Sequence, residues 1–239
     1  MVLEKIALLA SNTARTKAYI QKMIKDDMLP AVCILYADDI SQFEEELDDY
    51  EESVGIEYFN LNEPLLYSLN KANVPYVYVE NKDINSVEMS RCIANIQQEY
   101  LVYSGYGGYI LRKHLFELGK KYLHVHAGIL PQYRGSTTVY YSLLQEGIMG
   151  ATCIFLNEEI DEGEIIAQGS FALPEKYIDI DYVYEPYIRS CVLSKALAEY
   201  KANGVFASHS QEKENAEIYY IIHPVLKHFV LLGQEVRSE

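Results

Sequence analysis

The stretch Tyr-Leu-His-Val-His-Ala-Gly-Ile-Leu-Pro-Gln-Tyr-Arg-Gly-Ser, residues 122–136, joins an apolar strand candidate to a loop rich in glycine and proline. Its two histidines, His124 and His126, stand two residues apart, so an extended strand would point both imidazoles to the same face. Gly128 and Pro131 then mark the change from strand to shaped loop. Such a strand end is where an open α/β sheet usually binds its ligands.

The rest of the chain alternates between strand and helix candidates. Strands are predicted at 6–10, 31–36, 75–79, 100–104, 122–126, 151–156, 164–171 and 216–222. Helices are predicted at 14–25, 64–71, 85–98, 112–118, 138–146 and 181–203. A capping-box spacing of Asn85 and Glu88 predicts the start of the third helix. This order indicates an α/β fold with a Rossmann-like, open, mostly parallel twisted sheet and helices on both faces.

Composition limits the classes of function. The 239 residues carry a net charge of −15, which disfavours a nucleic-acid partner because polyanions bind basic faces. The acidic run at 38–52 is interpreted as a solvated helix face or loop. Four scattered cysteines indicate neither a disulfide framework nor a thiolate metal site, and the apolar run near the N-terminus is too short for a signal peptide or membrane span. A cytoplasmic protein without a membrane partner is expected.

Two loops near the strand ends bear on ligand binding. The turn at 11–14 contains no glycine, so no ATP or NAD site is predicted after the first strand. The loop at 105–108, Gly-Tyr-Gly-Gly, follows the strand that precedes the histidine strand. In a parallel sheet the two strands end on the same side, so we expect this loop and the histidines to share a crevice. Gly119 is expected to close the helix at 112–118 in a left-handed conformation.

Spacing alone leaves three interpretations of His124, His126 and the acidic loop at 158–164. The histidines could bind a metal with Asp161 as a third ligand, since both nitrogens point in one direction. They could instead serve metal-free acid–base chemistry with a carboxylate as proton acceptor. A pair of hydrogen-bonded core histidines is the third interpretation, and it is the favourite for an isolated His-x-His.

The extended motif separates these interpretations. His-Val-His-Ala-Gly-Ile-Leu-Pro-Gln-Tyr-Arg-Gly at 124–135, followed by Ile-Asp-Glu-Gly-Glu-Ile-Ile at 160–166, resembles the N10-formyltetrahydrofolate-dependent formyltransferase family. That family includes glycinamide ribonucleotide, methionyl-tRNA and nucleotide-amino-sugar N-formyltransferases. Its signature is Asn-x-His-(Pro or Ala)-x-x-Leu-Pro-x-x-Arg-Gly, then Leu-Asp-x-Gly about 25 residues later. The resemblance is specific over 100–170 and only topological over 1–99.

The resemblance implies a role for each central residue. His126 falls on the family histidine, which stabilises the formyl oxygen as it becomes negative, and Asp161 falls on the aspartate that helps to move the amine proton. His124 stands where the family has its catalytic asparagine, so it is a third catalytic candidate. An imidazole N–H can also donate to the formyl oxygen, and two close imidazoles resist both being cationic. We therefore expect transfer to be retained with altered pH dependence, and no metal to be required.

The resemblance also implies binding residues and a domain division. The residues expected to line the pocket of the co-substrate N10-formyltetrahydrofolate are Gly105, Tyr106, Gly108, Tyr109, Ile110, Leu156, Asn157, Glu159 and Ile160. The residues expected to bind the amine substrate are Arg134, Gly135, Ser136 and Thr137. A formyltransferase-type catalytic domain is expected at 1–173, followed by an extension at 174–239 made of a helix and a short strand.

The acceptor is inferred by elimination. Negative charge and chain length disfavour tRNA, and the missing glycine-rich phosphate loop near 11–16 weakens glycinamide ribonucleotide. A small amine remains, and a nucleotide-linked amino sugar of surface-glycan synthesis fits best. A formyltetrahydrofolate hydrolase or folate-binding protein is the alternative, and a metal-dependent hydrolase using His124, His126 and Asp161 is a weaker one. A homodimer is left open.

Overall fold

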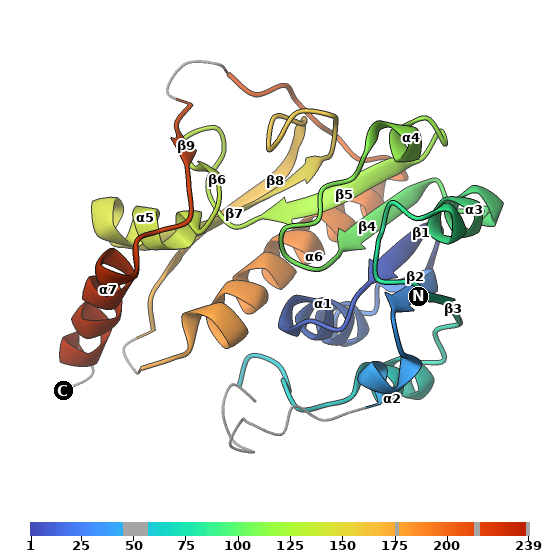
Figure 1. Ribbon diagram of the computed structural model, residues 1–239, viewed down its shortest axis with the longest axis horizontal. Helices are drawn as coiled ribbons and strands as arrows, with labels where there is room; N and C mark the ends of the chain where they lie inside the picture. Colours follow the sequence, from blue (N-terminus) through green and yellow to red (C-terminus); the bar gives the residue numbers. More distant parts are fainter. Residues whose placement is uncertain (45–56, 175–176, 213–215, 238–239) are drawn as a thin grey trace.

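The computed structural model describes residues 1–44, 57–174, 177–212 and 216–237 (Figure 1). Its centre is a seven-stranded sheet in the order β3-β2-β1-β4-β5-β7-β8. These strands are β1 (Val2–Ala10), β2 (Leu29–Ala37), β3 (Tyr76–Glu80), β4 (Tyr100–Ser104), β5 (Lys121–His126), β7 (Ile148–Phe155) and β8 (Ile165–Ala172). The first five run parallel, and β7 and β8 are antiparallel to their neighbours. The prediction of a mostly parallel, Rossmann-like sheet is confirmed.

Helices cover both faces of the sheet, as predicted. Alternate residues of β1 belong to two different cores, with Leu8 in one and Leu9 in the other, because successive strand side chains point to opposite faces. One core is covered by α1 (Ala14–Lys25), α2 (Leu65–Lys71), α5 (Thr138–Glu146) and α6 (Glu185–Asn203). The other core is covered by α3 (Val87–Asn95) and α4 (Lys113–Phe116). The sheet is therefore buried on both sides, as parallel sheets usually are.

The start of α3 differs from the prediction. Ser86 caps the helix by accepting the Met89 N–H at 3.2 Å, so the capping box expected from Asn85 is wrong. The Asn85 side chain instead accepts the Arg112 N–H at 2.8 Å and donates to the Ile110 carbonyl at 3.0 Å. Asn85 thus holds the loop after β4 in place, because its amide has long-range partners that local spacing does not reveal.

The ends of β4 and β5 place the functional loops. These strands pair in parallel, so Ser104 and His126 end at the same edge of the sheet. The chain leaves β1 toward β2 on one side and returns to β4 on the other. Such a reversal of strand order opens a crevice at the carboxyl ends of the strands, which is the usual ligand site of this architecture.

The C-terminal part is built into this framework. The buried face of α6 belongs to the same core as α1, and the chain then returns to form β9 (Ile218–Tyr219), which pairs in parallel with β6 (Arg134–Gly135). The strand predicted at 216–222 is therefore only two residues long. The last helix is α7 (Pro224–Arg237). The domain boundary at 173 stays a prediction.

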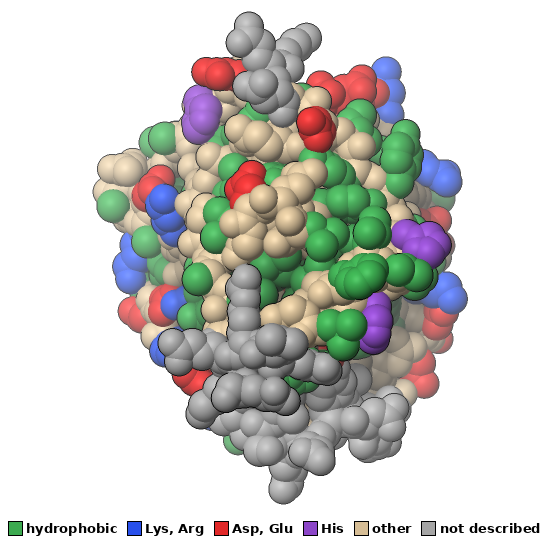
Figure 2. Space-filling model, turned by 90° about the vertical axis from the view of Figure 1, so that its left-hand side faces the viewer, with side chains coloured by type: hydrophobic (Ala, Val, Ile, Leu, Met, Phe, Trp, Pro, Cys, Tyr) green, Lys and Arg blue, Asp and Glu red, His purple; other side chains and the backbone are tan. Residues whose placement is uncertain are grey.

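Hydrophobic side chains gather on the face formed by β9 and α7 (Figure 2). The exposed members are Ile218, Tyr220, Ile221, Val225, Leu226, Phe229 and Leu232.

Of the acidic run at 38–52, Asp39 caps a short 3-10 turn at Ile40–Phe43, and residues 45–52 lie outside the described part. Within the described ranges, every helix is too short or too polar to cross a bilayer.

Candidate active site

His126 lies at the end of β5 with both ring nitrogens close to acceptors. Nε2 is 2.6 Å from the Tyr133 carbonyl oxygen, and Nδ1 is 3.3 Å from Oδ1 of Asp161. A carbonyl and a carboxylate only accept hydrogen bonds, so full pairing requires an N–H on both nitrogens. An N–H on either nitrogen of His126 is therefore directed at an acceptor within the protein.

Asp161 lies in the loop between β7 and β8, where its backbone adopts a left-handed conformation with φ of 55°. Its carboxylate also accepts the Gly135 N–H at 2.9 Å. Burial alone would raise the pKa of Asp161, but the hydrogen bond and charge of His126, together with the Gly135 N–H, lower that pKa to about 2. Asp161 is therefore an ionised, nearly buried carboxylate at neutral pH.

The backbone of the loop around Asp161 has little conformational freedom. A side chain at Gly163 would overlap the carbonyl oxygen of Phe155, so only glycine fits there. A non-glycine residue in the left-handed region costs about 1–3 kcal/mol and persists only where its surroundings fix it. Strain of this kind is concentrated at functional sites.

His124 differs from His126 in its surroundings although both are on one face of β5. Its Nδ1 is buried without a hydrogen-bond partner among the described residues. Burial, and then the positive charges of Arg189 and Arg15, hold the pKa of His124 well below its usual value, so the ring is neutral. Burying a ring nitrogen whose lone pair accepts no hydrogen bond costs less free energy than burying an N–H that donates none. We therefore assign the proton to Nε2, which leaves a neutral N–H donor at the cavity wall.

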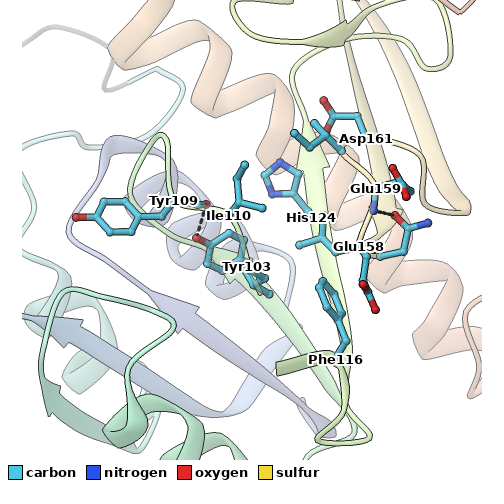
Figure 3. Close-up of a pocket in the computed structure, with 12 residues that line it drawn as sticks. Tyr103, Tyr109, Ile110, Phe116, His124, Glu158, Glu159 and Asp161 are labelled. Atoms are coloured by element: carbon cyan, nitrogen blue, oxygen red, sulfur yellow. Dashed lines mark hydrogen bonds between the residues drawn. The ribbon is translucent and has the colours of Figure 1, made fainter. Parts of the chain in front are cut away.

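His124 lines two cavities, and Figure 3 shows the residues around the smaller one. The smaller measures about 120 Å³ and the larger about 890 Å³. The residues that line both are Tyr103, Tyr109, Ile110, His124, Ile160 and Asp161. A neutral donor and an ionised carboxylate thus lie together at the junction of two cavities. Chemically, the pair can donate a hydrogen bond to one group while accepting a proton from another.

Comparison with known proteins agrees with this geometry. A family model described as formyl transferase matches residues 4–178. The chain belongs to the formyl transferase family. Among curated proteins, the methionyl-tRNA formyltransferase of Finegoldia magna is 27% identical over 137 residues, which are 56% of this chain and 43% of that protein. The corresponding enzyme of Listeria monocytogenes serotype 4a is 34% identical over 102 residues, 42% of this chain and 32% of that protein. The chain therefore matches less than half the length of these curated relatives.

Solved structures share the fold. The N-formyltransferase from Helicobacter canadensis, in complex with folinic acid and dTDP-3-aminofucose, has a TM-score of 0.59 at 14% identity and covers 92% of this chain and 71% of its own. A sugar N-formyltransferase from a Shewanella species has a TM-score of 0.57 at 17% identity, with 96% and 87% covered. At these identities the likeness shows the fold of a formyl transferase and leaves the substrate open.

The predicted binding residues divide between the two cavities. The smaller is lined by the predicted residues Tyr109, Ile110, Leu156, Asn157, Glu159 and Ile160. The larger is lined by the predicted residues Tyr106, Gly108, Tyr109, Ile110, Ile160, Arg134, Gly135, Ser136 and Thr137. The expected crevice between the loop after β4 and the histidines is therefore present. Gly105 lines neither cavity; its lack of a side chain makes room for the Tyr103 ring.

Arg134 does not point a free guanidinium at a ligand. Its Nη1 is 2.8 Å from the Glu162 carboxylate and its Nη2 is 2.8 Å from Oε1 of Gln211. The predicted role of Arg134 in substrate binding stays a prediction, and its hydrogen bonds favour a role in holding the loop of Asp161.

Several residues that line the two cavities were not predicted from the sequence. Tyr103 and Phe116 line the smaller cavity, and Arg15, Glu185 and Arg189 line the larger one. An available signal was the i, i+4 spacing of Glu185 and Arg189 on a predicted helix, where the two side chains form an ion pair at 2.5 Å. Within the described residues, no group of three His, Cys, Asp or Glu side chains is arranged to hold a metal ion.

The neutral His124 predicts a pH dependence of stability. Its folded pKa is below the unfolded value near 6.5, so its contribution is fully present above pH 6.5 and is lost as pH falls. We expect the free energy of unfolding to drop by about 1 kcal/mol from this group between pH 7.5 and 5.5. Urea titrations at the two pH values measure it. His124→Asn should remove this part of the drop, and an equal drop in both proteins would contradict the assignment.

Proposed function

We propose that this chain transfers the formyl group of N10-formyltetrahydrofolate to the amine of a small substrate, with a nucleotide-linked amino sugar as the acceptor. The observation that carries the proposal is the ionised Asp161 beside the neutral His124 where the two cavities meet. Membership of the formyl transferase family supports the reaction class. The choice of acceptor is supported by the larger cavity and by the solved structures of related proteins.

The transfer requires a proton acceptor and an oxygen-stabilising donor. The amine nitrogen forms a bond to the formyl carbon, the bond from that carbon to N10 breaks, and the amine proton ends on N10. Asp161 is suited to accept that proton from the amine and pass it on, because its carboxylate is ionised at neutral pH. Nε2–H of His124 is suited to donate to the formyl oxygen as that oxygen gains negative charge.

This assignment differs from the role that family resemblance gives to His126. The resemblance assigns the oxygen-stabilising role to His126, but its nitrogens already face the Tyr133 carbonyl and the Asp161 carboxylate. We therefore assign the donor role to His124 and the positioning of the carboxylate to His126. An imidazole at 124 thus takes the place of the family asparagine as a neutral N–H donor.

The smaller cavity has the character that a folate ring needs. Its walls include the apolar side chains of Ile110, Leu111, Phe116 and Leu156, and one edge is the polar segment 157–161. A flat aromatic ring system can pack on such a wall while its hydrogen-bonding edge meets the polar segment. At about 120 Å³ the cavity suits the ring part of a folate, and these residues would hold it.

The larger cavity supports a polar acceptor. Arg15, Asp181, Glu185 and Arg189 line it, and Glu185 and Arg189 pair with each other at 2.5 Å, so its wall is polar and carries both signs of charge. The Helicobacter canadensis relative was solved with a nucleotide-linked amino sugar. Methionyl-tRNA is the second candidate, because the curated relatives carry that activity in their names, but the charge of −15 opposes a polyanion.

Cytoplasmic location also stays a prediction, as does a homodimer, which the exposed apolar face of β9 and α7 favours.

Incubation with N10-formyltetrahydrofolate and a panel of amines tests the proposal. The panel contains dTDP- and UDP-linked amino sugars, glycinamide ribonucleotide and methionyl-tRNA, and mass spectrometry detects the formylated product. We expect a formylated amino sugar. Formylated methionyl-tRNA would favour the second candidate, and release of formate without any acceptor would favour a formyltetrahydrofolate hydrolase. Intact folate binding without turnover on any amine would reject the transferase function.

A further inference from the structure

We propose that the segment after α6 completes the active site, and that Gln211 is a positioning residue that fixes the loop of Asp161. The kinetic part of this inference rests on the proposed function. Gln211 lies 50 residues after Asp161 in sequence and outside the range matched by the family model, which ends at residue 178.

The side chain of Gln211 ties together three parts of the site. Its Nε2 donates to the backbone carbonyls of Asp161 at 2.7 Å and Gly163 at 2.8 Å. Its Oε1 accepts from Nη2 of Arg134 at 2.8 Å. Between the two carbonyls lies Glu162, whose carboxylate pairs with the other end of the same guanidinium at 2.8 Å. The loop is therefore held on its backbone by Gln211 and on its side chain by Arg134.

These hydrogen bonds act where the backbone is strained. Asp161 is left-handed, and Gly163 is so close to the Phe155 carbonyl that no side chain fits. Strained conformations persist only if neighbouring contacts over-determine them. A neutral amide that donates to both flanking carbonyls meets this need without adding a charge beside the carboxylate.

The segment that carries Gln211 is itself firmly docked. Ile165 and His209 exchange backbone hydrogen bonds of 2.9 and 3.0 Å, which adds a short strand pairing beside the start of β8. The Phe206 ring packs on Tyr200 with a centroid distance of 4.5 Å and on Tyr100 at 4.9 Å. The backbone that carries Gln211 is therefore held in place, so the Gln211 side chain can restrain the loop of Asp161.

The same C-terminal segment supports Asp161 from a second direction. Arg134 N–H donates to the Glu217 carbonyl at 3.0 Å, and Ser136 N–H donates to the Tyr219 carbonyl at 2.9 Å. This pairing of β6 with β9 places the Gly135 N–H on the Asp161 carboxylate at 2.9 Å. Residues 204–212 thus fix the loop backbone through Gln211, and residues 217–219 fix one carboxylate oxygen through Gly135.

Two variants of Gln211 and one control separate positioning from simple structural support. Gln211→Glu keeps an oxygen for Arg134 but cannot donate to the two carbonyls when ionised, and Gln211→Ala loses all three contacts. Ser208→Ala is the matched control, because Ser208 lies on the same segment and, among the described residues, its hydroxyl hydrogen-bonds Glu164, at 2.6 Å, rather than the loop of Asp161. Thermal melts of all three proteins confirm that they are folded at the assay temperature.

The first readout is backbone amide exchange and needs no activity. In both Gln211 variants we expect the amides of 161–163 and of Gly135 to exchange at least about 10-fold faster than in the wild type, with the amides of β7 unchanged. The second readout is kinetic: kcat should fall about 10- to 100-fold while the KM values change less than about 3-fold, because a misplaced carboxylate impairs chemistry more than binding. Ser208→Ala should match the wild type in both readouts.

Wild-type exchange rates and wild-type kcat in both Gln211 variants would overturn the inference. Normal exchange in Gln211→Glu alone would also overturn it, since that result would leave only the Arg134 contact important. If the wild type transfers no formyl group to any amine, the proposed function fails, but the exchange readout still decides the role of Gln211.

Discussion

Asp161→Asn is expected to abolish formyl transfer, with kcat lowered at least about 10³-fold. The substitution preserves the size of the side chain and can still accept the Gly135 N–H, but an amide cannot take the proton that the amine loses on attack. The depressed pKa of Asp161 keeps the wild-type carboxylate ionised across the neutral range, so the loss should be seen at every pH from 6 to 8. Single-turnover kinetics at saturating donor and amine measure it.

Binding provides the control for this variant. Asp161→Asn should bind a stable formyl-folate analogue within about 3-fold of the wild type, because most of the smaller cavity is unchanged. Glu164→Gln, at an exposed acid three residues further along, should leave kcat unaltered. A fully active Asp161→Asn protein would show that the carboxylate does not accept the proton.

His124→Ala should lower kcat by about 10²- to 10³-fold, the usual effect of removing one donor to a developing oxyanion. His124→Asn should retain transfer within about 10-fold of the wild type, because an amide N–H can replace the neutral imidazole N–H. Stopped assays at pH 7.5 with the best amine of the panel measure both variants. Comparing the two variants distinguishes the loss of the hydrogen-bond donor from the loss of the volume of the imidazole ring.

Two outcomes would contradict the role of His124. Wild-type kcat in His124→Ala would show that no hydrogen bond from residue 124 stabilises the formyl oxygen. Activation of a wholly silent wild type by His124→Asn would show that the site has diverged from formyl transfer.

Local chemistry explains which parts of the fold were predictable. Helix α1 begins and ends at the predicted residues because Thr13 caps it and its apolar positions recur at helical spacing. The boundaries of β4 and α5 were also predicted correctly. The pairing of β6 with β9 was not predicted, because a two-residue strand carries no periodic pattern and its partner is more than 80 residues away.

The site was predicted in part for a similar reason. Alternation along β5 places His124 and His126 on one cavity, as the sequence predicted. Their different hydrogen bonds depend on how the following loop folds back, which brings the Tyr133 carbonyl to His126 and leaves Nδ1 of His124 without a hydrogen-bond partner among the described residues. Gln211 and Arg189 reach the site from segments far along the chain; Gln211 lies in no motif, and Arg189 is marked only by its i, i+4 spacing from Glu185.

The most direct test of the central claim is a crystal structure with a non-reactive formyl-folate analogue. We predict that the formyl oxygen lies within about 3.2 Å of Nε2 of His124, with the formyl carbon facing the larger cavity and Asp161. His126 should keep its contacts with Tyr133 and Asp161. A formyl oxygen bonded to His126 instead, or a folate ring bound outside the smaller cavity, would contradict the account.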